Sequence, residues 1–137
     1  MVKAVYIGRH VLLPAQEVAV RACGLEIAEK IENLPTDSRE LQKLVNELKQ
    51  KGIAAVVTIA LPPNLLAVLG SAFDLYVFEM QSTTVASIDE AMNFVRSDPS
   101  KRTYLPGKPN ESIRVLEFKG INKLKIIIES KPVYTVP

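Results

Sequence analysis

The sequence predicts an α/β fold of the Rossmann-like, three-layer type, with a mainly parallel sheet and a C-terminal β-hairpin. Strand-like and helix-like apolar patterns alternate along the chain, which is typical of βαβ units. Residues 53–60 form a continuous apolar run rich in β-branched side chains, the pattern of a strand covered on both faces. Two further β-prone runs, residues 113–118 and 124–129, flank a glycine-containing turn signal and indicate a hairpin within residues 113–131.

The first third of the chain predicts a strand, a helix and a second strand. Residues 3–8 form a short β-prone run that ends at a glycine. A helix is expected to begin near Pro14, because proline suits the first helical turn, and Gly24 fits a left-handed position just after its end. Its apolar spacing places Cys23 on the buried face, as a core residue rather than a nucleophile. Residues 25–31 alternate apolar and charged side chains and suit a strand at the edge of the sheet.

The helix with the strongest signal spans residues 39–51, between a capping box and a glycine. Asp37 and Glu40 form the box, and Gly52 fits the C-terminal end. Its apolar stripe has the i, i+3, i+4, i+7 spacing of one helix face and consists of Leu41, Leu44, Val45 and Leu48.

The middle of the chain predicts two more helices with a strand between them. A proline pair opens the short helix 64–69, and we expect Gly70 to end it. Residues 75–80 form the next strand. Ser87 and Glu90 make a second capping box that opens the fourth helix. Residues 97–112 then form a long loop with three prolines and a glycine, of the kind that serves as a functional lid or is disordered.

Composition excludes several classes of protein and site. One cysteine and one histidine provide neither an internal disulfide nor a tetrahedral zinc site. No dinucleotide or P-loop glycine motif is present, so we expect no cofactor and no metal. No apolar run approaches the ~18 residues that cross a bilayer, and the first residues lack a signal-peptide layout, so we expect a cytoplasmic domain. Aromatic residues make up only 6% of the chain, which argues against direct binding of nucleic acid.

Candidate functional residues follow from the rule that open α/β sheets bind ligands beyond the carboxyl ends of their strands. After the first strand come Gly8, which allows close approach of a ligand to the backbone, Arg9 and His10. A guanidinium holds a phosphate or carboxylate through two hydrogen bonds, and an imidazole exchanges protons near pH 7. The alternative is a surface Arg-His pair that ends a strand, with the histidine bonded to the backbone.

Polar residues also follow the third and fourth predicted strands. Asn64 either contacts a ligand base or caps the helix that it begins. Ser82, Thr83 and Thr84 are expected in a turn, where they either donate hydroxyl and N–H groups to an anion or satisfy their own backbone.

The formal net charge of +2 conceals a basic C-terminal third. Residues 1–95 carry 8 Lys or Arg and 11 Asp or Glu, for a net charge of −3, whereas residues 96–137 carry 9 and 4, for +5. Lys101 and Arg102 belong to this basic part, and they either close over phosphates from the long loop or are simply solvated.

An apolar run near the C-terminus predicts a homodimer. Residues 126–128 are three consecutive isoleucines in the expected hairpin, and an apolar edge strand is a liability unless it is covered. Either a second copy of the chain covers this edge, or a neighbouring helix or the tail of residues 133–136 does so within one chain.

Two short segments resemble a known family. They are similar to segments of small CRISPR-accessory proteins. The first segment is Gly8-Arg9-His10, and the second is residues 58–65, which contain Leu-Pro-Pro-Asn-Leu. In those proteins the first strand ends in Arg-His and the third in a Leu-Pro-x-Asn-Leu turn. They share a Rossmann-like core with domains that bind cyclic oligoadenylate, and several are regarded as ring nucleases.

The resemblance implies roles for particular residues of this chain. Arg9 would bind phosphate, His10 would act as a general acid or base, and Asn64 would contact the ligand. The implied enzyme is a metal-independent phosphodiesterase, in which a ribose 2′-hydroxyl attacks its own phosphate. The chain departs from the family at Gly8, where a serine is expected, and in the 97–112 loop and the C-terminal hairpin.

Two functions are therefore open at this point. The first is a ring nuclease or sensor that binds a nucleotide-like anion, such as cyclic oligoadenylate, at the carboxyl edge of the sheet. The second is a non-catalytic Rossmann-like module that dimerises and contacts an unknown ligand or partner.

Overall fold

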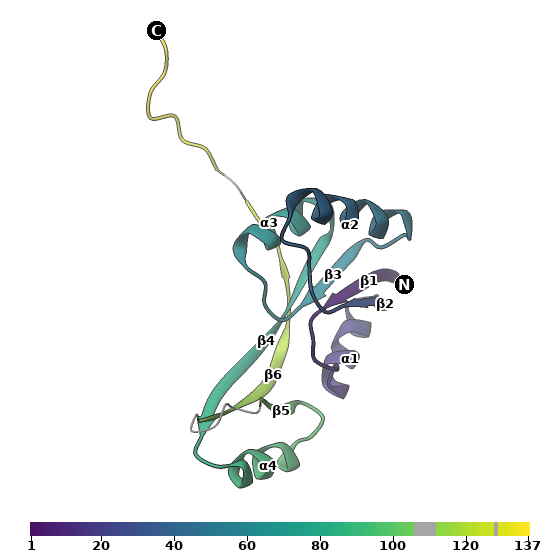
Figure 1. Cartoon of the computed structure of the whole chain (residues 1–137), viewed down its shortest axis with the longest axis vertical. Helices are drawn as coiled ribbons and strands as arrows, with labels where there is room; N and C mark the ends of the chain where they lie inside the picture. The colour runs from purple at the N-terminus through teal and green to yellow at the C-terminus, as the bar shows by residue number, and fades with distance from the viewer. Residues whose placement is uncertain (106–111, 128) are drawn as a thin grey trace.

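A computed structural model shows four helices around one curled, six-stranded sheet, and describes residues 1–105, 112–127 and 129–137 (Figure 1). The strands are β1 (Val2–Ile7), β2 (Leu25–Ile31), β3 (Ala55–Thr58), β4 (Asp74–Val85), β5 (Arg102–Leu105) and β6 (Ile113–Leu124). The helices are α1 (Pro14–Ala22), α2 (Ser38–Gln50), α3 (Pro63–Ala72) and α4 (Ile88–Ser97). None of the helices in these ranges is long and apolar enough to cross a membrane.

The predicted α/β class is confirmed, but the prediction of a mainly parallel sheet is wrong. The strand order is β2-β1-β3-β4-β6-β5, with parallel pairing from β2 to β4 and antiparallel pairing of β6 with both β4 and β5. The sheet is therefore mixed, and the narrower prediction of a Rossmann-like three-layer sandwich is not confirmed. β2 lies at the edge of the sheet, as its alternating pattern predicts.

Two apolar cores lie on opposite faces of the parallel strands. Side chains of α2 and α3 pack on one face, against Val5 and Ile7 of β1 and against β3 and β4. Side chains of α1 pack on the other face, against Ala4 and Tyr6 of β1. Strand β1 therefore alternates between the two cores, and the segment after it leaves the sheet between them.

Local signals predict most of the helix ends correctly. Gly24 and Gly52 follow α1 and α2 with φ angles of +77° and +82°, a backbone conformation that favours glycine. Asp37 Oδ1 accepts hydrogen bonds from the backbone N–H groups of Arg39 (2.8 Å) and Glu40 (3.2 Å), as its capping position predicts. Ser87 Oγ accepts one from Glu90 N at 3.2 Å in the same way.

Two predictions about helix ends are wrong. Helix α3 continues through Gly70 to Ala72, because Phe73 at its C-terminus donates its N–H to Leu69 O and closes the last turn beyond the glycine. Cys23 is exposed rather than part of the core, since it follows the last residue of α1 and leaves the buried stripe.

The largest correction concerns the C-terminal hairpin. The predicted turn at residues 119–123 does not exist, because β6 runs through it and pairs with β4 from Leu75 opposite Leu124 to Val85 opposite Ile113. Glu79 lies opposite Gly120 and Met80 opposite Phe118, so Lys119 is an extra residue in β6. The residues predicted to form a turn therefore include a bulge within a continuous strand. Pairing along all of β4 satisfies more backbone hydrogen-bonding groups than a local turn would.

The long loop predicted at residues 97–112 is partly a strand. It contains β5, which pairs antiparallel with β6, so β5 and β6 are the consecutive antiparallel strands near the C-terminus. Residues 106–111, which connect them, lie outside the described part of the chain. Strands β4 and β6 extend together beyond the parallel strands, and α4 and β5 lie at the far end of this extension (Figure 1).

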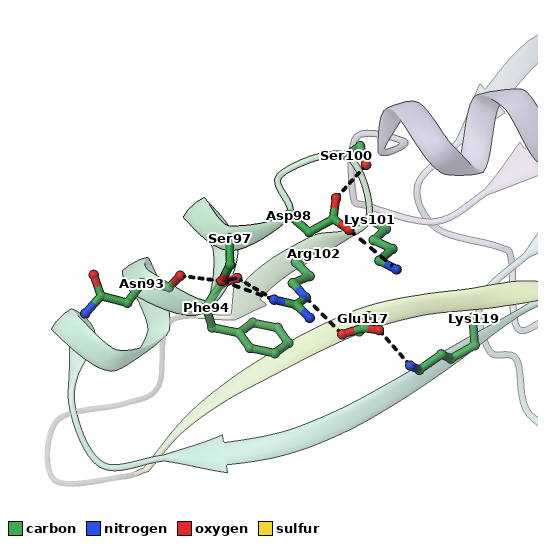
Figure 2. Close-up of polar contacts among 9 residues, drawn as sticks. All are labelled: Asn93, Phe94, Ser97, Asp98, Ser100, Lys101, Arg102, Glu117 and Lys119. Atoms are coloured by element: carbon green, nitrogen blue, oxygen red, sulfur yellow. Dashed lines mark hydrogen bonds and ion pairs between the residues drawn. The ribbon is translucent and has the colours of Figure 1, made fainter.

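A polar cluster around Arg102 fastens α4 and β5 to β6 (Figure 2). Arg102 Nε donates to Glu117 Oε2 at 2.9 Å, and its Nη1 donates to Ser97 Oγ at 3.1 Å and to Phe94 O at 3.3 Å. The guanidinium also lies 4.4 Å from the centroid of the Phe94 ring. Lys119, the bulge residue, donates to Glu117 Oε1 at 2.6 Å. Glu117 of β6 therefore connects the extension of the sheet, through Arg102, to the unit of α4 and β5 that lies at its end.

Replacing Glu117 should test this cluster through its dependence on pH. The hydrogen bond from Lys119, then that from Arg102, lowers the pKa of Glu117 below its ordinary value of 4.5. A lowered folded-state pKa contributes stability above pH 4.5, and this contribution is lost as pH falls through the lowered pKa. Glu117→Gln should therefore lower the thermal unfolding midpoint at pH 7 and reduce the difference between the midpoints at pH 7 and pH 3.

The matched control is Glu79→Gln on the neighbouring strand β4, because Glu79 is exposed and has no ion-pair partner among the described residues. It should leave both midpoints nearly unchanged. Equal effects of the two substitutions would contradict the role given to Glu117.

Candidate anion-binding cleft

A cleft of about 520 Å³ lies beyond the carboxyl ends of β1 and β3, where open α/β sheets bind ligands. One wall consists of the segments that follow these strands, residues 8–10 and 59–61. The other wall comes from the extension of the sheet and includes Ser82 of β4, Leu105 of β5 and Arg114 of β6. The long β4–β6 pair therefore provides the cleft with its second wall.

Backbone and side-chain hydrogen bonds hold the first wall in place. Gly8 N donates to Ile31 O of β2 at 2.9 Å, and the buried Thr58 hydroxyl donates to Ile7 O at 2.9 Å. Arg9 Nη2 donates to Asn33 Oδ1 at 2.8 Å, and Lys30 Nζ to Arg9 O at 3.4 Å. The end of β1 is thus tied to both of its neighbours, which fixes the point from which Arg9 and His10 leave the sheet.

Arg114 is the charged residue among those described in the second wall. Its Nε and Nη2 atoms donate to Ser82 Oγ at 3.1 and 2.9 Å. Arg114 is not among the residues predicted from the sequence, because it lies within the expected hairpin and follows none of the strand ends at which ligand-binding residues were sought. The only signal that included it was the excess of basic residues after position 95.

The cleft therefore combines two arginines with one histidine. Arg9 and Arg114 are both exposed, and within the described residues neither forms an ion pair with a carboxylate. Glu32 also lines the cleft and opposes part of this positive charge. A guanidinium group binds phosphate or carboxylate oxygens through paired hydrogen bonds, so two arginines in one cleft favour an anionic ligand.

Four of the nine predicted site residues line this cleft: Gly8, Arg9, His10 and Ser82. The expectation of a turn at Ser82, Thr83 and Thr84 is wrong, because these residues continue β4 and pair with β6. Thr83 and Thr84 do not line the cleft. Asn64 is exposed outside it, in the first turn of α3, and its side chain does not cap the helix.

The predicted cations of the loop are also absent from the cleft wall. Lys101 Nζ lies 3.4 Å from Asp98 Oδ2, and Arg102 is bound to Glu117 (Figure 2). The pKa of Asp98 is lowered first by the Ser100 hydroxyl and then by Lys101. Of residues 97–105 only Leu105 reaches the cleft, so the positive charge comes from Arg114 instead.

Gly8 has a packing role that the sequence did not reveal. A Cβ atom at position 8 would lie 2.6 Å from the Tyr6 hydroxyl oxygen and 2.8 Å from Cζ of the same ring. Tyr6 is buried, so the ring has little space to move away. A serine here, which the family resemblance leads us to expect, would meet the same obstacle.

Comparison with known proteins gives no match to any protein-family model, curated protein or solved structure. Within the described ranges, no three His, Cys, Asp or Glu side chains are grouped as metal ligands. The case for a function therefore depends on the geometry of the cleft.

Adding a methyl group at position 8 should disturb both Tyr6 and the adjoining cleft. Gly8→Ala is expected to destabilise the protein by about 1–3 kcal/mol, because overpacking displaces a buried ring. Chemical denaturation measures this change. Gly120→Ala is the matched control, since a Cβ there would meet nothing within 4 Å. A Gly8→Ala protein as stable as the Gly120→Ala protein would contradict the packing role.

Proposed function

We propose that this cleft binds a nucleotide-like anion through its phosphates and cleaves cyclic oligoadenylate without a metal. The observation that carries the proposal is that Arg9 and Arg114, which lie far apart in the sequence, line one cleft together with His10. The resemblance of the Arg9-His10 segment to the CRISPR-accessory ring nucleases favours cyclic oligoadenylate among the nucleotide-like anions. A Rossmann-like core, as in that family, is part of the same proposal.

The chemistry requires only groups that the cleft contains. His10 takes the proton of a ribose 2′-hydroxyl as its oxygen bonds to the adjacent phosphorus, and the bond from phosphorus to the 5′-oxygen breaks. The leaving 5′-oxygen takes a proton from the imidazolium. Arg9 and Arg114 neutralise the charge that develops on the phosphate oxygens. The products are a 2′,3′-cyclic phosphate and a free 5′-hydroxyl.

Substitutions in the two walls should separate binding from cleavage. Arg9→Gln and Arg114→Gln should each weaken binding of cyclic tetra-adenylate about ten- to a hundredfold, because each removes charged hydrogen bonds to phosphate. His10→Ala should slow cleavage about 10²- to 10⁴-fold while binding is largely retained. Calorimetry measures binding, and chromatography of the products without added metal measures cleavage.

Arg39→Gln provides the control, because Arg39 is exposed in α2 and does not line the cleft. It should leave binding and cleavage as in the wild type. An unmodified protein that neither binds nor cleaves cyclic tetra-adenylate would refute the specific ligand. Binding without cleavage would support a sensor and refute the enzyme.

A second candidate function is a non-catalytic module that associates with another copy of the chain. The C-terminal segment leaves the body of the protein after β6 (Figure 1). Its large apolar side chains are exposed, with exposed fractions of 68% for Ile127, 97% for Val133 and 78% for Tyr134. The described part of the tail therefore does not cover the isoleucine run, and residue 128 of that run lies outside the described residues. A second copy that buries these side chains would remove the exposed apolar surface.

Association through this segment predicts a dimer that depends on its apolar residues. Sedimentation of the full chain should show a mass that rises to that of two copies with concentration. Ile127→Lys should shift this equilibrium towards the monomer by at least about tenfold, since it would bury a charge at the interface. Thr36→Lys, at an exposed site elsewhere, should not. A monomer at all concentrations would exclude this candidate.

A further inference from the structure

A second cleft, of about 710 Å³, lies between α1 and strands β1 and β2. Its apolar wall includes Val20 of α1 together with Leu25 and Ile27 of β2, and Tyr6 of β1 also lines it. Among the residues that the structure describes, His10 alone lines both this cleft and the anion-binding cleft. We call this second cleft the α1 cleft. It has no part in the function proposed above.

Tyr6 lines the α1 cleft and carries an unsatisfied polar group, a hydroxyl whose oxygen lies beside Gly8. The residue is only 1% exposed, and its hydroxyl has no hydrogen-bond partner among the described residues. No other buried side-chain oxygen or nitrogen in this part of the chain lacks a partner. Buried hydroxyl groups almost always have one, so an exception calls for an explanation.

The contacts of the ring do not explain why position 6 carries a hydroxyl. The ring lies 6.4 Å from that of Phe78, and Gly8 leaves the space that its outer end occupies. Phenylalanine would make the same ring contacts without burying an unpaired oxygen. Burial raises the pKa of Tyr6, so the hydroxyl stays protonated at neutral pH and can donate a hydrogen bond.

The charges around the α1 cleft differ from those of the anion-binding cleft. Arg21 and Lys30 line it, but so do Glu17 and Glu26, so the charges of these four side chains cancel and only the amino group of Met1 adds to them. Apolar walls with balanced charges at the rim favour an uncharged, mostly apolar occupant. A second polyanion is not favoured here.

We propose that the α1 cleft binds an uncharged, largely apolar small molecule that presents one hydrogen-bond acceptor to the Tyr6 hydroxyl. The hydroxyl oxygen is covered in the structure, so a side chain of the wall moves as the ligand enters. We assign this movement to Lys30, which lines the cleft, is exposed, and has its Nζ 6.0 Å from the centroid of the Tyr6 ring. This site does not depend on the function proposed for the other cleft.

A pair of probe molecules tests the proposed hydrogen bond. Benzimidazole and indole have almost the same shape and are uncharged at pH 8, but only benzimidazole has a ring nitrogen that accepts a hydrogen bond. Titration of the isotope-labelled full chain, followed by nuclear magnetic resonance, should shift signals of residues that line the α1 cleft. Benzimidazole should bind about fivefold or more tightly than indole.

Tyr6→Phe should abolish this preference, so that both probes bind with the affinity of indole. The variant should fold at least as stably as the wild type, because it removes an unpaired buried hydroxyl. The control is Tyr76→Phe, on β4, which does not line the α1 cleft and should retain the preference. Titration with pyrophosphate should give the same affinity in the wild type and Tyr6→Phe, since this anion addresses the other cleft.

Three outcomes would overturn the proposal. The first is that neither probe shifts signals from the α1 cleft. The second is equal affinity of the two probes for the wild type, as expected if the hydroxyl pairs only with water. The third is a preference that survives in Tyr6→Phe. Absence of pyrophosphate binding alone would count against the function proposed for the anion-binding cleft and leave this site intact.

Discussion

The antiparallel pairing of β4 with β6 is the constraint on which the architecture depends. Both strands have twelve residues and extend far beyond the parallel strands beside them (Figure 1). Their extension carries α4 and β5, and it brings Arg114 to the cleft that Arg9 also lines. Without this extension the cleft would have only one wall, with a single arginine. The bulge residue Lys119 also stabilises this extension. It donates a hydrogen bond to Glu117, the residue that holds α4 and β5 through Arg102.

The end of β1 is the second place where fold and function meet. Thr58 and Ile31 hold this end from both sides through hydrogen bonds to Ile7 and Gly8. The glycine leaves room for the Tyr6 hydroxyl, whereas the two residues after it enter the anion-binding cleft. The anion-binding cleft and the α1 cleft, which differ in charge, therefore both adjoin the end of β1, and His10 lines both of them. A change at Gly8 acts on both of them through packing.

The sequence predicts the features that depend on neighbouring residues. Asp37 and Gly52 mark the ends of α2 because caps and left-handed glycines act within one helical turn. Pairing between β4 and β6 joins residues about forty positions apart, and no local pattern encodes it. The same limit explains the site: Arg9 and His10 were found because they follow a strand, whereas Arg114 reaches the cleft only through that distant pairing.

A crystal structure of the full chain with pyrophosphate tests most directly whether the two arginines form one anion site. We expect electron density for the anion between the guanidinium groups of Arg9 and Arg114, within hydrogen-bond distance of both. Arg114 would then exchange its present partner, the Ser82 hydroxyl, for a phosphate oxygen or share its donors between the two. Pyrophosphate bound elsewhere on the protein, or a cleft that stays without the anion at saturating concentration, would contradict the account.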